Sequence, residues 1–449
     1  VWPVAVTARA RRRLPRPVTG QIAPGLAAIW AVGILIRLAL APFTVHLDLY
    51  HVYSRAAQAA YHGEWFVWTS QLAIQMVHNI WLFLVKPLLP GAETIWSPTA
   101  AVFGLGAQPS EFRDLFLRYP HLFRALLLLK LPYLVADLGT GYLLTHLVAP
   151  ERRRRVLALW LLNPIVLYTS AVFGRHDSIA VFLVVASLVA AARGRRYLGL
   201  GLLGLGAVTR FFPFFLAPFF ILAYRRSKRD LALFAGGLAG VWLAVEVVAL
   251  AATGSSPTLT LLSRYQHVDY LTDLVLPLRF GDRLFIFPLA YGLFLLWFFE
   301  RGEHGARGTD AYVAAGAAMF LGMFALTFFH PPYAIWLVPF LALTVDRDDR
   351  LIAYHLAQAA LLILFALHWD TQMTTDLFLP LDPDGVAALP NPRTVLAAQV
   401  PVPLFLGVVR SLFDALALWM AYRIVRERLS RAEEEVPLEP DGEAGGHGA

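Results

Sequence analysis

Residues 44–64 read Thr-Val-His-Leu-Asp-Leu-Tyr-His-Val-Tyr-Ser-Arg-Ala-Ala-Gln-Ala-Ala-Tyr-His-Gly-Glu and follow the first long apolar run of the chain. If this stretch is helical from Asp48, one face carries a carboxylate, an imidazole and a guanidinium at Asp48, His51 and Arg55. The opposite face carries apolar and small residues. The pattern predicts an amphipathic helix at a bilayer surface, in which Asp48 is either a functional carboxylate or only the helix N-cap.

The composition is that of a membrane protein. Of the 449 residues, 58% are hydrophobic and 15% are charged, and the charges fall between apolar runs of membrane-spanning length. The net charge of +7 is confined to short clusters, so it indicates orientation in a lipid bilayer and no nucleic-acid partner. Because the chain has no cysteine, a disulfide framework and a thiolate metal site are excluded.

Composition divides the chain into three parts. Residues 1–22 form a basic arm, residues 23–426 form a multi-span membrane domain, and residues 427–449 form an acidic, glycine-rich tail that we expect to be disordered. The first apolar run is long and lacks a small-residue cleavage site, so we interpret it as an uncleaved signal anchor. The apolar runs together predict an all-α polytopic membrane protein with about 12 transmembrane segments.

Arginine clusters predict which side of the membrane each loop occupies. Those at residues 9–16, 152–155 and 225–229 lie beside apolar runs and mark the cytoplasmic side. This places both termini in the cytoplasm of a protein of the plasma membrane and makes residues 44–120 a long external loop. The apolar patch at residues 80–89 is too short to cross a bilayer, so we expect interfacial helices in this loop.

Residues 197–224 are apolar except for Arg210, and both flanks are basic. A single crossing would break the positive-inside pattern, whereas a short hairpin preserves it. Pro213 and Pro218 provide places for the chain to bend. We therefore predict a helical hairpin whose turn carries Arg210 toward the external side.

The candidates for chemistry are polar residues at the predicted external ends of spans, where ionisable groups are costly unless they face a site or water. They are Asp48, Arg175, His176, Asp177, Arg210, Arg264, His267, Asp269 and His330. A solvated loop is the alternative interpretation of Arg264, His267 and Asp269. Four charged residues inside the predicted spans are expected to form interhelical pairs instead: Lys130, Asp137, Glu246 and Asp414.

Four stretches resemble one family. Residues 45–53, Val-His-Leu-Asp-Leu-Tyr-His-Val-Tyr, are similar to the first external loop of type-C membrane glycosyltransferases, and most similar to that of bacterial polyprenyl-phosphate-mannose-dependent mannosyltransferases. Residues 162–179 resemble the family's asparagine-proline and glycine-x-x-aspartate pattern, in which Asp177 matches. In that pattern, Arg175 stands where glutamine is common and His176 where an aromatic residue is common.

The third stretch places Arg210 before Phe-Phe-Pro, where relatives usually carry lysine before a proline. The fourth, His-Pro-Pro-Tyr-Ala-Ile-Trp-Leu-Val-Pro from His330, is similar to a late external turn that precedes a proline-containing helix. The four stretches extend over residues 44–340 in the order in which the family has them.

The resemblance implies an inverting glycosyltransferase with its active site on the external face. It implies a polyprenyl-phosphate-linked sugar donor, with mannose as the expected sugar, a membrane glycolipid or glycan as the acceptor, and Asp48 as the general base. The donor phosphate, being an anion, is expected on Arg210, Arg175, Arg264 and His330. The substrates are expected to contact His51, Arg55, Asp177, His176 and Tyr333.

No cofactor is expected, because the sequence has no glycine-rich phosphate loop and no Asp-x-Asp in the first loop. Binding of a divalent cation by His46, Asp48 and Asp177 is an alternative that the sequence leaves open. The alternative function is a transporter of lipids or lipid-linked oligosaccharides, with the arginines lining a path for head groups. A structural scaffold is the third hypothesis, but it does not explain why the polar residues gather at the predicted external ends of the spans.

Overall fold

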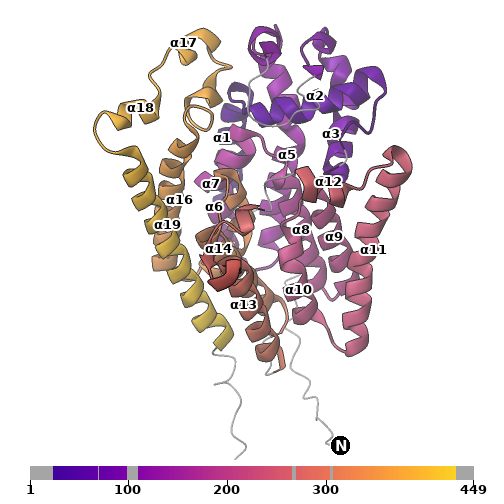
Figure 1. The fold of residues 1–449 in the computed structure, drawn as a ribbon, viewed down its shortest axis with the longest axis vertical. Helices are drawn as coiled ribbons and strands as arrows, with labels where there is room; N and C mark the ends of the chain where they lie inside the picture. The colour runs from indigo at the N-terminus through magenta and orange to yellow at the C-terminus, as the bar shows by residue number, and fades with distance from the viewer. Residues whose placement is uncertain (1–23, 69, 99–109, 265–268, 304–306, 431–449) are drawn as a thin grey trace, which may run out of the picture.

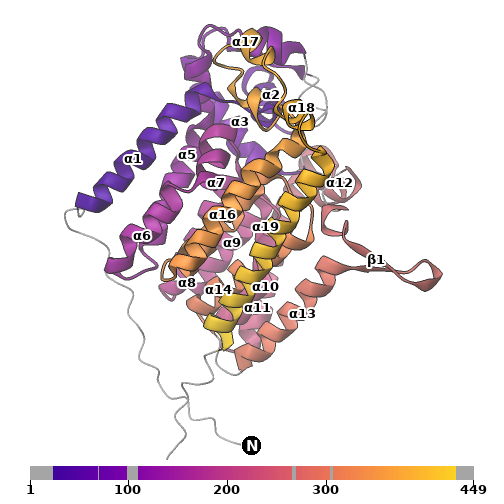
Figure 2. The same ribbon diagram turned by 90° about the vertical axis from the view of Figure 1, so that its left-hand side faces the viewer.

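Most of the chain forms a bundle of tilted helices with smaller helices gathered over one end (Figures 1 and 2). The computed structural model describes residues 24–68, 70–98, 110–264, 269–303 and 307–430. Within these residues the only strands are β1 (Val275–Pro277) and β2 (Arg283–Phe285), which pair as an antiparallel hairpin.

The helices of the bundle are α1 (Pro24–Leu40), α5 (Leu122–Thr145), α6 (Pro150–Leu161), α7 (Pro164–Leu167), α8 (Asp177–Ala192), α9 (Arg196–Thr209), α10 (Pro213–Tyr224), α11 (Lys228–Thr253), α13 (Ile286–Glu303), α14 (Thr309–Leu326), α15 (Val338–Thr344), α16 (Asp349–Phe365) and α19 (Val402–Ile424). The helices at the capped end are α2 (Leu47–His62), α3 (Leu72–Val85), α12 (Pro257–Arg264), α17 (Pro383–Ala387) and α18 (Pro392–Ala397).

Short 3-10 and π segments join these helices. They are η1 (Ala41–Phe43), η2 (Lys86–Leu88), η3 (Ala92–Thr94), η4 (Phe112–Phe116), η5 (Tyr168–Phe173), η6 (Asp269–Leu271), η7 (Arg279–Gly281), η8 (Pro331–Trp336), η9 (Ala366–Trp369), η10 (Thr375–Phe378) and η11 (Val425–Ser430).

Five helical stretches of the described chain are long and apolar enough to cross a membrane: Gly25–Phe43, Lys228–Thr253, Thr309–Leu326, Asp349–Trp369 and Val402–Leu429. The pair Pro150–Leu161 and Pro164–Phe173, bent by 46°, brings the number to six if it forms one broken span. These helices support the predicted helical multi-pass membrane protein. Each predicted span coincides with helix, but α8, α9, α10 and α15 are shorter than a bilayer crossing needs, so twelve crossings remain a prediction.

The predicted hairpin is present as α9, a turn and α10. Helix α9 ends because Arg210 adopts an extended conformation, with φ −150° and ψ 140°. Helix α10 then begins at Pro213, whose ring fixes a helical φ and whose missing N–H is not needed at that position. Pro218 lies inside α10. Arg210 therefore lies in the turn, after the C-terminus of α9 and before the N-terminus of α10, as predicted.

The charged loops predicted to be cytoplasmic gather at the end of the bundle away from α2. There, Arg152 contacts Asp346, Arg155 contacts Asp349, and Arg423 lies 3.2 Å from Asp348. At the other end, the amide of Val45 donates to the carbonyl of Leu377 at 2.9 Å. This bond joins the segment before α2 to the segment beyond α16, and both views show α2, α17 and α18 at the same end of the bundle (Figures 1 and 2). The two predicted groups of loops thus occupy opposite ends, and the membrane side of each end remains a prediction.

One buried ion pair links α1 to α5 inside the bundle. The Asp137 carboxylate accepts from Arg37 Nε at 2.7 Å and Nη2 at 3.0 Å, from Trp160 Nε1 at 2.9 Å and from Ser170 Oγ at 2.6 Å. Arg37 Nη1 donates to the carbonyls of Gly33 and Leu161. We call Arg37, Asp137, Trp160 and Ser170 the inner network. It confirms the interhelical pair expected for Asp137.

The other three charges have no oppositely charged partner on another helix in the described part of the chain. Glu246 still joins two helices, because it lies in α11 and accepts from Thr258 in α12 as well as from Ser256 between them. Asp414 pairs within α19 with Arg410, at 2.9 Å. Lys130 has no carboxylate partner in the described part of the chain and donates to carbonyl oxygens, because the breaks after α1 and in η5 leave carbonyls to be satisfied there.

Candidate functional site

The site begins at the first turn of α2. His46, not Asp48, is the N-cap, because its ring Nδ1 accepts from the backbone N–H of Asp48 at 3.1 Å. The ring also stacks on Phe173, with centroids 3.7 Å apart. The interpretation of Asp48 as the N-cap was therefore wrong, and its carboxylate has no capping role.

Two arginines and two aspartates form a continuous chain of ion pairs, which we call the outer network. The Asp48 carboxylate contacts Arg175 Nη1, Arg175 Nε lies 3.0 Å from Asp177 Oδ2, and Arg210 Nε lies 3.1 Å from Asp177 Oδ1. Trp336 Nε1 donates to Asp177 Oδ1 at 2.7 Å. Asp177 is fully buried, and these donors compensate its charge.

A glycine and a lysine shape the loop that supplies two members of this network. Gly174 adopts φ +76°, the left-handed region that only glycine enters readily, and a Cβ there would lie 2.7 Å from the Lys130 side chain. Lys130 Nζ donates to the carbonyls of Thr44, Ala171 and Val172 at 2.7–2.9 Å. This holds the segment before α2 against η5, so Asp48 and Arg175 meet.

Aromatic rings form one wall of the outer network. The Tyr333 ring centroid lies 5.3 Å from the guanidinium of Arg175 and 5.1 Å from that of Arg210. Tyr333 also accepts from Arg175 Nη2 at 3.3 Å. Its ring stacks on Trp336 at 4.6 Å, and Trp336 stacks on Phe212 at the same distance. The turn at Arg210 and segment η8 are thus fixed against each other.

A cavity of about 90 Å³, which we call the polar pocket, opens on the Asp48 side of the network. Its lining residues are His46, Leu47, Asp48, His51, Arg175, His330, Tyr333, Trp369, Gln372 and Met373. It brings together five of the predicted site residues: Asp48, His51, Arg175, His330 and Tyr333. Burial, and then the positive charge of Arg175, hold the pKa of His46 well below its usual value, so this ring is neutral at pH 7.

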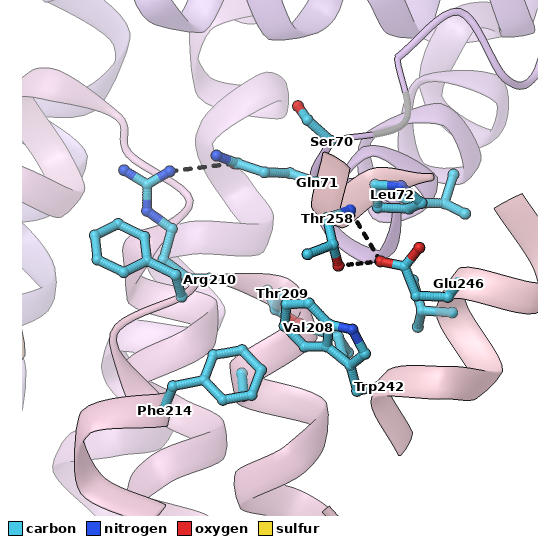
Figure 3. A pocket seen from close by; sticks show the side chains of 14 residues that line it. Ser70, Gln71, Leu72, Val208, Thr209, Arg210, Phe214, Trp242, Glu246 and Thr258 are labelled. Carbon is cyan, nitrogen blue, oxygen red and sulfur yellow. Dashed lines mark hydrogen bonds between the residues drawn. The ribbon is translucent and has the colours of Figure 1, made fainter. Parts of the chain in front are cut away.

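A second cavity, the Arg210 groove, lies on the other side of the network and is shown in Figure 3. Arg210 Nη1 donates to Gln71 Oε1 at 3.1 Å at its rim. The rest of the lining is mainly apolar and includes Leu72, Phe214 and Trp242. It also includes the Glu246 carboxylate, which accepts from Ser256 and Thr258. Arg210 therefore stands between a carboxylate network and an apolar groove.

Other predicted site residues lie away from the polar pocket. The Arg55 guanidinium stacks 3.8 Å from the ring centroid of Trp68, and His176 is buried with its ring 5.5 Å from that of His78. Neither lines the pocket. Arg264 ends α12, but its side chain and that of Asp269 lie outside the described part of the structure, as does His267.

Sequence reasoning missed several residues of the site. Trp369 is the last residue of a span predicted at Leu351–Trp369 and Gln372 follows it, so their position at the predicted external end was the available signal. Trp336 lies inside a predicted span, and Gln71 in a predicted external loop shows no motif. Trp336 also belongs to the fourth family-like stretch, but that stretch does not indicate its contact with Asp177, and nothing in the sequence marks Gln71, because the partners of both come from distant segments.

Among the residues that the structure describes, no group of three or more His, Asp or Glu side chains is arranged to hold a metal ion. Comparison with protein-family models, with curated proteins and with solved structures found no match to the chain.

Proposed function

We propose that the protein is an inverting glycosyltransferase that moves a sugar, mannose by resemblance, from a polyprenyl-phosphate donor to a glycolipid or glycan at the external membrane face. In this reaction the acceptor hydroxyl oxygen attacks the anomeric carbon and gives its proton to Asp48. The bond from that carbon to the phosphate oxygen breaks, and the electron pair leaves with the lipid phosphate. Arginines stabilise the charge that develops there.

The observation that carries the proposal is the contact between Asp48 and Arg175 at the polar pocket. A base and a phosphate-binding cation must lie within one substrate's length of each other for this reaction. Residues from α2, from the loop before α8 and from η8 converge at the polar pocket, and Arg210 of the α9–α10 turn joins them through Asp177 and Tyr333. A solvated loop would give no reason for that convergence.

The ion pair suggests how the two roles are coupled. In the structure Arg175 holds Asp48, and a carboxylate held in this way is a weaker base. A donor phosphate is a competing bidentate acceptor for a guanidinium. When the phosphate takes over Arg175, Asp48 is released for the acceptor hydroxyl. Proton removal then begins only when the donor is bound.

The Arg210 groove fits the remaining part of the donor. Arg210 is the cation at that groove, and a mainly apolar wall suits an isoprenoid chain. The transporter alternative needs a polar path through the bundle. The charged residues of the inner network are buried and hydrogen bonded to each other and to backbone carbonyls, so they offer no binding group to a passing head group, which favours the enzyme.

The test is turnover with purified protein and a panel of polyprenyl-phosphate sugars, read as release of the lipid phosphate. Release with one sugar donor, lost in Asp48→Asn, supports the proposal. Asp384→Asn is the matched control, because Asp384 lies at the same end of the molecule with 82% of its side chain exposed. If no donor is consumed, or if Asp48→Asn turns over like the wild type, the proposal fails.

A further inference from the structure

A third cavity adjoins the polar pocket and is much larger, about 360 Å³, within the range of about 300–1,000 Å³ typical of ligand sites. We call it the Met373 groove. It is walled by α7, η5, α16 and η10, and its lining includes Ile165, Tyr168, Leu362, Met373 and Phe378. None of the residues that line it is charged. A hydrocarbon is the ligand chemistry that such a lining accepts without leaving a polar group unpaired.

The Met373 groove meets the polar pocket at one residue, since Met373 lines both cavities. The Met373 side chain is buried between the two cavities. Because methionine is unbranched and adapts its shape readily, a ligand that occupies both cavities needs only this side chain to change its rotamer. Tyr168 donates from its hydroxyl to the Met373 carbonyl at 3.1 Å, which fixes the backbone there. A molecule with a polar head in the polar pocket can therefore extend an apolar chain into the groove.

The groove also lies where a membrane lipid can enter it. Ala359, Leu362 and Ile363 belong to α16, one of the helices long and apolar enough to cross a bilayer. Of the residues that line the groove, Ile363 is 58% exposed and Phe378 is 40% exposed. These exposed apolar residues face outward at the edge of the bundle, where lipid chains lie.

The two apolar grooves differ in charge, and that difference assigns their ligands. The Arg210 groove is lined by the Arg210 guanidinium, which a lipid phosphate requires, and by the Glu246 carboxylate, which accepts from Ser256 and Thr258. The lining of the Met373 groove has no cation, so we expect the lipid whose hydrocarbon chain binds there to have an uncharged head group. We propose, resting on the proposed function, that the acceptor is a lipid-anchored sugar whose hydrocarbon chain occupies the Met373 groove while its hydroxyl reaches Asp48.

The experiment compares two acceptors that carry the same sugar, a long-chain alkyl glycoside and a methyl glycoside, at a fixed polyprenyl-phosphate-mannose concentration. The variant Ala359→Phe fills the groove from a buried position, and Ala360→Phe on the exposed side of the same helix is the matched control. We expect Ala359→Phe to raise the KM for the long-chain acceptor about tenfold or more. Two methylene groups, at about 0.8 kcal/mol each, already account for that change. The KM for the methyl glycoside and for the donor should not change.

Three results would overturn the inference. They are an unchanged KM for the long-chain acceptor in Ala359→Phe, equal losses in Ala359→Phe and Ala360→Phe, and a rise in the donor KM instead, which would assign the groove to the donor chain.

A photoactivatable long-chain glycoside gives a readout that needs no turnover. Labelling of the segments around residues 359–363 and 373–378 in the wild type, blocked by excess unlabelled long-chain glycoside and not by methyl glycoside, supports the inference. Labelling spread over all lipid-facing helices overturns it. If no donor is consumed but the groove is labelled, the proposed reaction has failed while the hydrocarbon site stands.

Discussion

The inner and outer networks solve the same physical problem in different ways. Each contains a fully buried aspartate that accepts from arginine and from a tryptophan indole N–H. In the inner network, Arg37 donates two hydrogen bonds to the Asp137 carboxylate from Nε and Nη2. Its third nitrogen, Nη1, donates to two backbone carbonyls. In the outer network two arginines divide one carboxylate, and their other donors reach Asp48, Tyr333 and Gln71.

The difference shows what separates a structural ion pair from a site. Every donor of Arg37 is directed at a fixed acceptor of the fold, so adding a ligand there would break the bundle. Each arginine of the outer network donates one hydrogen bond to each of several partners, and these partners lie at the edges of cavities. A phosphate can replace one such partner at little structural cost. Asp137 and Asp177 are equally buried and both are paired, so the distribution of the arginine donors distinguishes the two networks. Exposure distinguishes them as well, because the Asp48 side chain is 33% exposed.

The largest expected effect is on chemistry in the outer network. Asp48→Asn keeps the side-chain volume but cannot take a proton, and loss of a general base costs about 10²–10⁴ in rate. Thermal stability should stay near that of the wild type, because His46 rather than Asp48 caps α2. Turnover and thermal unfolding in detergent are measured on the same samples. A large fall in stability, with turnover per folded molecule kept, would make Asp48 structural like Asp137.

The next effect is on stability in the inner network. Asp137→Ala leaves Arg37 buried without its carboxylate and should cost about 3–5 kcal/mol, whereas the double variant Arg37→Met, Asp137→Leu should lie close to the wild type. Turnover per folded molecule should be retained in both. Thermal unfolding measures the first quantity and specific activity the second. Loss of activity in a double variant of wild-type stability would show that the inner network takes part in function.

Matched arginine-to-lysine changes sharpen the comparison. Lysine gives a point charge in place of a fork of donors, and each bond lost to a charged partner is worth about 1.5–3 kcal/mol. Arg210→Lys should raise the donor KM by about tenfold or more, with a modest loss of stability. Arg37→Lys should lower stability and leave the donor KM unchanged. Identical KM values for the two variants would show that Arg210 has only the structural role of Arg37.

The smallest expected effect is a pH dependence that is specific to the outer network. The pKa of His46 is lowered by burial and then by Arg175, His330 and His51, whereas the unfolded ring titrates near its ordinary value of about 6.5. The unfolded state therefore binds the extra proton first, and stability falls as pH drops below about 6.5, by up to about 1.4 kcal/mol per pH unit.

The measurement is thermal unfolding between pH 7.5 and pH 5. His46→Asn is the comparison, because asparagine is a strong N-cap that does not titrate. Other buried histidines contribute equally to both proteins, so the slope of the wild type minus that of His46→Asn isolates His46. Equal slopes would contradict the prediction.

The sequence was sufficient where charge and periodicity act locally. The basic flanks of residues 197–224 predicted the α9–α10 hairpin, and the external ends of predicted spans correctly grouped Asp48, Arg175 and Arg210. It was insufficient where a partner comes from far away. The indole of Trp336 reaches a carboxylate 159 residues earlier, and no local pattern carries that information.

Competition between local rules explains a second kind of miss. Asp48 is a strong N-cap residue type, yet the cap is His46, because stacking on Phe173 fixes that ring beside the helix start. Arg55 follows Asp48 at helical spacing, but it lies beyond the residues of α2 that line the polar pocket. Its guanidinium packs on Trp68 instead. Helical spacing predicted which residues share one face of α2, but packing determines which part of that face borders a cavity.

The order of charges along the outer network has a consequence for synthesis of the chain. Asp48 emerges 127 residues before Arg175, and Asp177 emerges 33 residues before Arg210. Arg175 is therefore synthesised after one of its two carboxylate partners, Asp48, and Arg210 after Asp177, so the α9–α10 hairpin follows its counter-ion. Arg37 precedes Asp137 by 100 residues and has no such help. Insertion of the first helix is accordingly the step at which a nascent chain depends most on the translocation machinery.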